Sequence, residues 1–392
     1  MSNDVFILSA QRTPIGSFLG SLSTVAAPQL GATAIASAIK KAGVELQQIE
    51  ECIMGNVLTS GVGQAPARQA ALAAGLPSSV PCMTINKVCG SGLKSIMLAA
   101  DAIQLGRHQI AVAGGQENMS LAPHLLENSR SGYRMGHVKM IDSMLKDGLW
   151  DPYNDFHMGN AAELCVREYK SNREEQDAFA KNSYEKAQTA QKKGWFNEEI
   201  IAVEVPNKKE TLQIKIDDEP GKAQFEKMLT LRPAFDKEGS ITAANASKIN
   251  DGGAAVVLSS SASVKKNGFK SLAKIITQAH FANDPKWFTT APVGAMKKAL
   301  NQAQLKADDI DLWEINEAFS IVTMAAMKEL NIPDAKVNVH GGAVALGHPI
   351  GASGARIFTT LIHALKTQNK KYGCASLCIG GGEAVAVIVE NL

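Results

Sequence analysis

The stretch "VPCMTINKVCGSGLKSI" at residues 80–96 joins a short strand-like run to a helical pattern through one cysteine and a glycine-rich turn. A second stretch, "VNVHGGAVALGHPIGASGARI" at residues 337–357, has the same order of features, with His348 in its turn. Each follows an Ala-rich helical pattern and precedes a strand-like run that ends in glycines. Because these features match in order, duplication of one α/β unit explains the likeness better than chance does.

The predicted duplication divides the chain into three parts. Residues 1–118 form the first half, which residues 249–270 complete, and residues 271–392 form the second half. Residues 119–248 are predicted to be an inserted loop domain that caps a functional site. Their charged helical stretches and the hairpin-like run at residues 204–222 differ in composition and pattern from the two halves. Strands that alternate with amphipathic helices favour a parallel sheet in each half.

The composition is that of an ordinary globular protein, with 45% hydrophobic and 20% charged residues. Its 40 basic and 38 acidic residues give a net charge of +2. This balance argues against a nucleic acid or a membrane surface as a partner bound through net charge. A strand pattern begins by Val5, leaving no room for a targeting peptide, and the terminal "VIVENL" is no peroxisomal signal. The sequence therefore predicts a cytoplasmic protein.

The cysteines are too sparse for a disulfide framework and lack the paired spacing of a zinc site. The six lie at positions 52, 82, 89, 165, 374 and 378. Cys374 and Cys378 are compatible with a redox pair, although two residues on one face of a strand is the simpler interpretation. The glycine-rich runs match neither a dinucleotide-binding fingerprint nor a phosphate-binding loop, which disfavours hydride transfer and nucleotide hydrolysis.

Cys89 lies where the predicted strand gives way to the predicted helix. A free cysteine is usually an inert, buried residue. At a helix N-terminus, however, unpaired N–H groups and the helix dipole lower the pKa of a thiol. Gly90 and Gly92 would let backbone or substrate approach closely. Local sequence alone leaves both interpretations open.

Three further candidates stand in comparable settings. His348 lies between glycine and proline in the matching turn, where it would act as a base for Cys89 if the halves pack pseudo-symmetrically. Cys378 ends a predicted strand before three glycines, so it is either a buried strand residue or an acid/base beside oxyanion-binding N–H groups. Asn316, in "WEINEAFS" at residues 313–320, either caps a helix or positions a water or carbonyl.

Taken together, the motifs resemble the thiolase family, and within it the short-chain, biosynthetic acetyl-CoA acetyltransferases. The resemblance covers essentially the whole chain. The motifs are "RTPIGSFLGSL", "NKVCGSGLKSI", "AGGQENMS", "HMGNAAE", "LRPAF", "NASKINDGGAAVV", "NEAF", "GGAVALGHPIGASGAR" and "CIGGGEA".

The resemblance implies two similar α/β halves in a five-layer α-β-α-β-α stack, with an insertion over the active site. It implies a homotetramer built as a dimer of dimers. The implied reaction is the reversible Claisen condensation of two acetyl-CoA to acetoacetyl-CoA plus CoA, by a ping-pong mechanism through an acetyl-cysteine. Coenzyme A is then substrate and product, and no separate cofactor is expected.

The resemblance also implies catalytic roles. Cys89 would carry the acetyl group, and His348 would take its proton. Cys378 would remove a proton from the methyl group of the second acetyl-CoA. Asn316 would hold a water that forms one oxyanion hole with His348, and the N–H groups of Cys89 and Gly380 would form the other.

For substrate binding, the resemblance implies that His157 and Met158 line the acyl pocket, a pair that favours acetoacetyl-CoA over long 3-ketoacyl-CoA. Ser247, Ala318 and Phe319 would line the pantetheine channel, and Leu149 would line its adenine end. Many relatives carry an arginine where this chain has Pro220-Gly221-Lys222, near the CoA phosphates. Lys222 would replace it as a mobile point charge rather than a planar fork.

Other functions were weighed against these residues. The nearest is a 3-ketoacyl-CoA thiolase of broader chain length. A ketosynthase would have histidine in place of Cys378, and a 3-hydroxy-3-methylglutaryl-CoA synthase would need a catalytic glutamate. A non-catalytic acyl-CoA-binding protein on the same fold would have lost Cys89, His348 or Cys378, and all three are present. Redox regulation at Cys89 or at Cys374 and Cys378 stays open beside catalysis.

Overall fold

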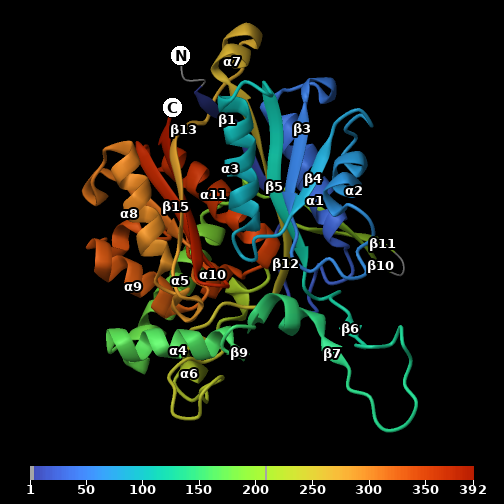
Figure 1. Ribbon diagram of the computed structural model, residues 1–392. Helices are drawn as coiled ribbons and strands as arrows, with labels where there is room; N and C mark the ends of the chain where they lie inside the picture. Colours follow the sequence, from blue (N-terminus) through green and yellow to red (C-terminus); the bar gives the residue numbers. More distant parts are fainter. Residues whose placement is uncertain (1–3, 208–209) are drawn as a thin grey trace.

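The computed structural model describes residues 4–207 and 210–392. Its main sheet has ten strands (Figure 1), in the order β14-β15-β16-β13-β1-β12-β5-β3-β4, with β2 paired to β12. These strands are β1 (Val5–Arg12), β2 (Gly16–Ser17), β3 (Glu51–Gly55), β4 (Cys82–Ile85), β5 (Ile110–Asn118), β12 (Asn250–Ser260), β13 (Ala273–Ala282), β14 (Leu312–Ile315), β15 (Tyr372–Ile379) and β16 (Glu383–Asn391).

The sheet and its helices form five layers. Helices α3 (Ser91–Gln104) and α11 (Ile350–Thr367) pack on each other in the middle, between the two halves of the sheet. Helix α1 (Ala27–Ala42), with α2 (Pro66–Ala73), covers the outer face of the first half. Helix α8 (Ala291–Ala303) covers the outer face of the second half. The predicted α-β-α-β-α stack is confirmed.

Glycines bring the two central helices into backbone contact. A Cβ atom added to Gly92 would lie 2.7 Å from the backbone nitrogen of Ala355. One added to Gly354 would lie 2.3 Å from the backbone nitrogen of Leu93. The sequence predicted that the glycines near Cys89 let either backbone or substrate approach closely. At Gly92 it is backbone, that of the other central helix, so that the two N-termini converge.

The sheet is mixed, which corrects the expectation of a parallel sheet in each half. Only the pairs β3–β4, β3–β5 and β14–β15 are parallel. The strands β1, β12, β13 and β16 pair antiparallel with their neighbours. Strand β16 follows β15 after a turn at residues 380–382, and such a short connection can join only antiparallel strands.

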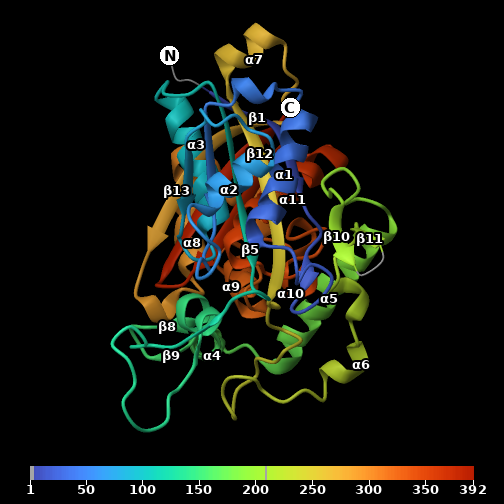
Figure 2. The same ribbon diagram turned by 90° about the vertical axis from the view of Figure 1, so that its right-hand side faces the viewer.

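The region between β5 and β12 lies against one end of the layered body (Figures 1 and 2). Its helices are α4 (Met158–Tyr169), α5 (Arg173–Lys192) and the short α6 (Phe225–Met228). Its short strands pair as β6 (His124–Leu125) with β7 (Ile141–Asp142), β8 (Trp150–Asp151) with β9 (Phe156–His157), and β10 (Val203–Asn207) with β11 (Glu210–Ile214). The antiparallel pairing of β10 with β11 confirms the expected hairpin, although residues 208–209 lie outside the described residues.

The remaining helices complete the two halves. They are α7 (Ser261–Asn267), α9 (Ser320–Leu330) and α10 (Ala343–Leu346), with short single turns at Leu46–Gln48, Pro285–Trp287, Ala307–Asp309 and Asp334–Lys336. The region between β5 and β12 has two more short turns, Leu145–Leu149 and Pro220–Lys222. The expected strand-like stretch before the turn at His348 is only an isolated bridge between Trp313 and Val337. Asn338 there has φ of 43°, and its side chain bonds both backbone polar groups of Ile315.

No helix within the described ranges is long and apolar enough to cross a membrane. The predicted division at residues 118, 248 and 270 stays a prediction, and residues 1–3 of its first part lie outside the described chain.

Candidate active site

Cys89 lies in a tight, strained turn between β4 and α3. Val88 has φ of 46°, a left-handed conformation that β-branched residues rarely adopt. The turn is fixed by Ser91, whose hydroxyl accepts from the N–H of Lys87 (2.8 Å) and donates to the carbonyl of Val88 (2.7 Å). Gly90 is the N-cap of α3. These two hydrogen bonds offset the strain at Val88 and hold Cys89 at the N-terminus of the helix, where the sequence predicted it.

The surroundings of the Cys89 thiol correct one expectation. Cys89 is only partly exposed, and desolvation raises the pKa of its thiol to about 12, which the N–H groups of Gly380 and of Cys89 itself only partly offset. The charge of Glu117 raises it further. Desolvation thus outweighs the helix terminus, which was expected to lower the pKa. A base must therefore remove the proton as the thiol attacks.

His348 presents such a base. Its backbone N–H donates to Asn250 Oδ1 at 2.9 Å, which fixes the turn, and its Nδ1 lies 2.6 Å from the hydroxyl of Ser353. That hydroxyl donates its one proton to the carbonyl of Pro349 at 2.9 Å, so it accepts from Nδ1–H. The neutral ring therefore has its lone pair on Nε2, which is buried and has no hydrogen-bond partner among the described residues.

The His348 ring is held neutral. Burial lowers its pKa to about 3, and the charge of Arg356 lowers it further. At neutral pH the Nε2 atom is thus an unprotonated acceptor that can take a proton during a reaction.

Cys378 lies near the end of β15, one residue before the turn that carries Gly380. Burial raises the pKa of this thiol well above its ordinary value, and interaction with Cys89 adds to the rise. A charge on the Cys89 sulfur therefore disfavours ionisation of Cys378. An anion at Cys378 would be a strong base, because its protonated form is favoured by the apolar surroundings of Met158 and Phe319.

Gly380 links these groups. Its N–H lowers the pKa of the Cys89 thiol. A Cβ atom at Gly380 would lie 3.6 Å from Val88 Cγ1 and 3.9 Å from Met158 Sδ, so the acyl-pocket candidate Met158 is a neighbour. The turn between β15 and β16 thus faces the turn that carries Cys89, although the two are separated by about 290 positions in sequence.

Asn316 follows β14 with both amide atoms of its side chain buried and without a hydrogen-bond partner in the described part of the chain. It is not a helix cap, since α9 begins only at Ser320. A buried amide of this kind requires an ordered water or a ligand. Its backbone is fixed by the carbonyl of Ser376, at 3.0 Å, and by the N–H of Ala318, at 3.0 Å.

A cavity of about 200 Å³ opens beside His348 and gathers five of the predicted residues. Its lining includes Leu149, His157, Ser247, Phe319 and His348. The ring of His157 stacks on Phe235, with the centroids 4.7 Å apart, and its Nδ1 accepts from the N–H of Gly159 at 3.0 Å. Burial lowers the pKa of His157. Met158 and Ala318 pack with Cys378 in the adjoining apolar cluster.

Lys222 lies apart from that group, on a second cavity of about 220 Å³. This cavity is lined by Tyr184, Lys222, Ala223, Gln224, Lys227, Met228, Leu231, Ala243 and Ala244. The Lys222 amine donates to the hydroxyl of Ser17. The two cavities flank one loop, residues 228–248, which supplies walls to both.

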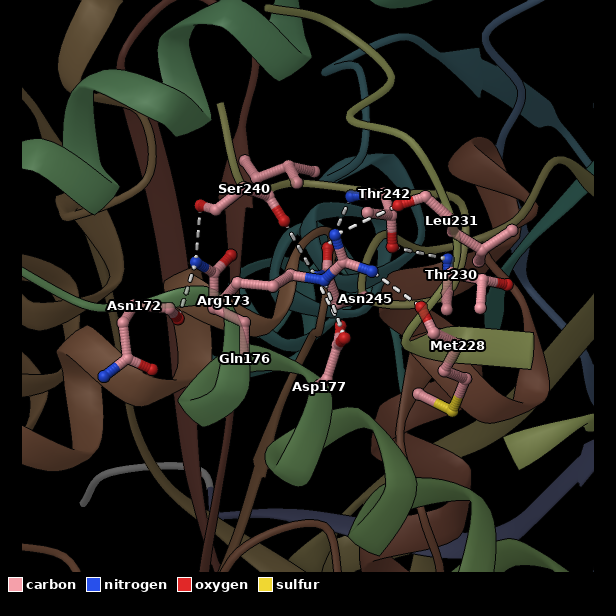
Figure 3. Close-up of polar contacts among 12 residues, drawn as sticks. Asn172, Arg173, Gln176, Asp177, Met228, Thr230, Leu231, Ser240, Thr242 and Asn245 are labelled. Carbon is pink, nitrogen blue, oxygen red and sulfur yellow. Dashed lines mark hydrogen bonds and ion pairs between the residues drawn. The ribbon is translucent and has the colours of Figure 1, made fainter. Parts of the chain in front are cut away.

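A polar network holds this loop on helix α5 (Figure 3). Arg173 donates to the carbonyls of Met228 (2.6 Å) and Leu231 (3.2 Å) and pairs with Asp177 at 2.6 Å. Asn245 donates to the other oxygen of Asp177 at 2.8 Å. The guanidinium therefore satisfies two loop carbonyls while its charge is balanced, and the loop has a fixed path between the cavities.

Sequence reasoning missed Ser353, Phe235 and Glu117 as individual residues. All three lie in motifs that had been singled out, but nothing in a motif shows which side chain faces the site.

Glu117 accepts from Asn56 Nδ2 (2.7 Å), from the N–H groups of residues 57 and 58, and from that of Gly351 (2.9 Å). It thus ties the start of α11 to the loop after β3, while burial raises its pKa to about 7.

Within residues 4–207 and 210–392, no group of three or more His, Cys, Asp or Glu side chains is arranged to hold a metal ion.

The Ser353 contact yields a test of the tautomer argument. Replacing Ser353 with alanine removes the acceptor for Nδ1–H, so both tautomers become populated and formation of an acyl-enzyme should slow by about tenfold. Ser353→Thr retains the hydroxyl and is the matched control.

Because the His348 pKa is near 3, the wild-type rate should show no loss from histidine protonation between pH 8 and 5. Rapid-quench acylation kinetics measure both; wild-type acylation by Ser353→Ala would refute the assignment.

Two family models together match nearly the whole chain. The thiolase N-terminal domain matches residues 5–262, and the thiolase C-terminal domain matches residues 269–391.

Full-length relatives are similar throughout. An acetyl-CoA acetyltransferase of Cupriavidus necator is 54% identical over 390 residues, covering 99% of each chain. A cytosolic acetyl-CoA acetyltransferase of Gibberella zeae is 49% identical over 390 residues, covering 99% of this chain and 98% of its own.

Two solved structures share the fold. The acetyl-CoA acetyltransferase of Bacillus anthracis has a TM-score of 0.98 at 40% identity, covering 100% of this chain and 99% of its own. A thiolase from Ascaris suum in complex with coenzyme A has a TM-score of 0.94 at 46% identity, covering 99% and 100%.

Proposed function

Since this chain belongs to the thiolase family and is an acyltransferase, we propose that it is an acetyl-CoA C-acetyltransferase. It condenses two acetyl-CoA reversibly to acetoacetyl-CoA plus CoA through an acetyl-Cys89 intermediate. One observation carries this proposal: the end of β15 that carries Cys378 packs on the turn that carries Cys89, since a Cβ atom added to Gly90 would lie 2.3 Å from the side chain of Ile379. Two thiols that share one site suit the two half-reactions of a Claisen condensation.

In the first half-reaction, His348 Nε2 takes the Cys89 proton as the sulfur attacks the thioester carbonyl. The oxyanion lies either between the N–H groups of Cys89 and Gly380 or against His348 and a water on Asn316. The tetrahedral species collapses to acetyl-Cys89, and CoA leaves as a thiol with the proton of Cys378. Cys378 is then a thiolate beside a protonated His348, and their opposite charges stabilise each other.

In the second half-reaction, the Cys378 thiolate removes a proton from the methyl group of a second acetyl-CoA. The carbanion attacks the carbonyl carbon of acetyl-Cys89 and forms the new C–C bond. Cys89 leaves and recovers its proton from His348, which restores the starting state. The burial that raises the Cys378 pKa supports this role, because a weakly acidic C–H needs a strong base.

The two cavities support the use of CoA thioesters. The reacting end would lie beside His348 and His157, and the pantetheine arm would follow Ser247 and Phe319 along the loop at residues 228–248. The CoA phosphates would reach Lys222 at the second cavity. The Ascaris suum neighbour, whose structure contains coenzyme A, supports the same ligand.

The decisive assay is thiolysis of acetoacetyl-CoA by CoA, and its rate is measured from the loss of enolate absorbance. 3-Ketoacyl-CoA substrates with acyl chains of four to ten carbons are compared in parallel. We expect kcat/KM to fall by at least about tenfold beyond four carbons, because a bulky acyl chain cannot enter a pocket bounded by His157, Met158 and Phe235. Equal rates across the series would favour the broader 3-ketoacyl-CoA thiolase instead. No thiolysis of any member would overturn the proposal.

We also propose a homotetramer. The segment between β6 and β7 projects from the body (Figure 1) and exposes apolar side chains. These are Leu126, Tyr133, Met135, Val138 and Met140, of which Met135 is fully exposed. Apolar groups gathered on a projecting segment favour contact with another copy. Light scattering during gel filtration tests the assembly, and a monomeric mass would exclude it.

A further inference from the structure

Lys248 carries its charge at the wall between the two cavities. The residue lines the first cavity, together with Ser247 and His348. Its amine lies 5.7 Å from the centroid of the Tyr184 ring, and Tyr184 lines the second cavity. The side chain therefore reaches from the wall beside the proposed base to the wall beside the proposed phosphate site.

Two backbone carbonyls from different segments hold this amine. Nζ of Lys248 donates to the carbonyl of Ala246 at 2.9 Å and to that of Val344 at 3.4 Å. Ala246 precedes Ser247 in the wall of the first cavity. Val344 lies in α10, a helix of one turn, and the carbonyls at the end of a helix have no partner within it. The amine therefore joins the end of the loop at residues 228–248 to α10.

The charge of the amine strengthens these contacts. The side chain is only partly exposed, and desolvation lowers the pKa of Lys248 to about 8, while the charges of Glu219 and Glu317 raise it. The amine is therefore mainly an ammonium at pH 7. Neither carboxylate, nor any other in the described part of the chain, forms an ion pair with it, so the two carbonyls are its hydrogen-bond acceptors. A charged donor makes a stronger hydrogen bond than a neutral one.

The same segment fixes the turn of the proposed base at a second point. Asn250, which follows Lys248 at the start of β12, accepts from the backbone N–H of His348 at 2.9 Å. Lys248 thus holds the chain just before His348, and Asn250 holds it at His348 itself. Val344 is also bound through its N–H, which donates to Glu317 at 3.1 Å. The path from α10 to the base is therefore fixed at both ends.

From these contacts we propose that the Lys248 ammonium is a positioning group, which locks the channel wall at Ala246 to the turn that carries His348. The thioester then meets a base whose backbone is held against the wall that guides the pantetheine arm. A shift of about 1 Å between reacting groups can slow a reaction by about 10²-fold, so this fixed distance affects the rate. The kinetic consequence rests on the proposed acetyl transfer, whereas the link to α10 exists without a substrate.

Hydrogen exchange tests the link in the full-length protein without any substrate. In Lys248→Met the apolar stem stays but the two carbonyls lose their donor, so the amides of residues 343–348 should exchange at least about tenfold faster. Lys181→Met is the matched control. The Lys181 amine also lies 5.7 Å from the centroid of an aromatic ring, that of Phe225, but bonds no backbone carbonyl among the described residues. Unchanged exchange in Lys248→Met would overturn the link, whether or not the protein transfers acetyl groups.

Chemical rescue tests the consequence for the reaction. Lys248→Ala should slow acylation of the protein by acetyl-CoA by about tenfold or more. Propylammonium supplies the atoms that alanine lacks and should raise this rate by at least about threefold, whereas tetramethylammonium, which has no N–H donor, and sodium chloride should not.

The three salts are compared at equal ionic strength by rapid-quench kinetics, and thermal melting checks that each variant has folded. A wild-type rate in Lys248→Ala, or equal effects of the three salts, would refute the positioning role. No acylation of the wild type would instead overturn the proposed function, and hydrogen exchange would still decide the link.

Discussion

Replacing Cys89 with serine is expected to abolish formation of the acetyl-enzyme, while replacing Cys378 with serine leaves it intact. A serine hydroxyl in the same turn is a weaker nucleophile and a poorer leaving group, so turnover by Cys89→Ser should fall by about 10³-fold or more. Cys378→Ser retains Cys89, His348 and both proposed oxyanion sites. It should therefore still become acetylated by acetyl-CoA.

The second variant should nevertheless fail in the carbon–carbon step. Serine cannot act as the strong base that the buried Cys378 thiolate provides, so condensation and thiolysis should fall by about 10²- to 10⁴-fold. Intact-protein mass spectrometry measures acetylation, and the enolate assay measures turnover. Cys374→Ser on the same strand is the matched control, because that side chain is buried in the apolar cluster under α8 and not in the cluster that holds Cys378. Normal turnover by either active-site variant would exclude the two-thiol mechanism.

The second large effect concerns stability. Gly354→Ala should destabilise the fold by about 3 kcal/mol or more, although alanine in an ordinary helix is about 1 kcal/mol better than glycine. The added methyl group would lie 2.3 Å from the backbone nitrogen of Leu93, and a helix backbone cannot move aside as a flexible side chain can. The central helices would have to separate, which also displaces the turns carrying Cys89 and His348.

Urea denaturation monitored by circular dichroism measures this effect, with Gly221→Ala as the control. A Cβ atom at Gly221 meets nothing within 4 Å, so that variant should change the free energy of unfolding by less than about 0.5 kcal/mol. Equal stability of Gly354→Ala and the wild type would show that the two helices do not need this close approach.

Much of the fold follows from local pattern. The Ala-rich runs before the two turns became α2 and α9, the helical runs after the turns became α3 and α11, and the charged run became α5. The direction of the strands could not be predicted from local pattern, because the same alternating pattern suits parallel and antiparallel neighbours. The stretch around Asn338 looked like a strand but has its polar groups satisfied by Ile315 in a left-handed turn.

The sequence by itself determined the chemical groups: a cysteine in one glycine-rich turn, a histidine in the matching turn and a second cysteine before three glycines. These are local features, since residue type and turn chemistry are written in a few adjacent positions. The tertiary structure alone decided the state of those groups. Burial raises the pKa of Cys89 that the helix terminus was expected to lower, and Ser353 sets the tautomer of His348. Desolvation and hydrogen bonding depend on atoms brought together from distant parts of the chain, so no local pattern specifies them.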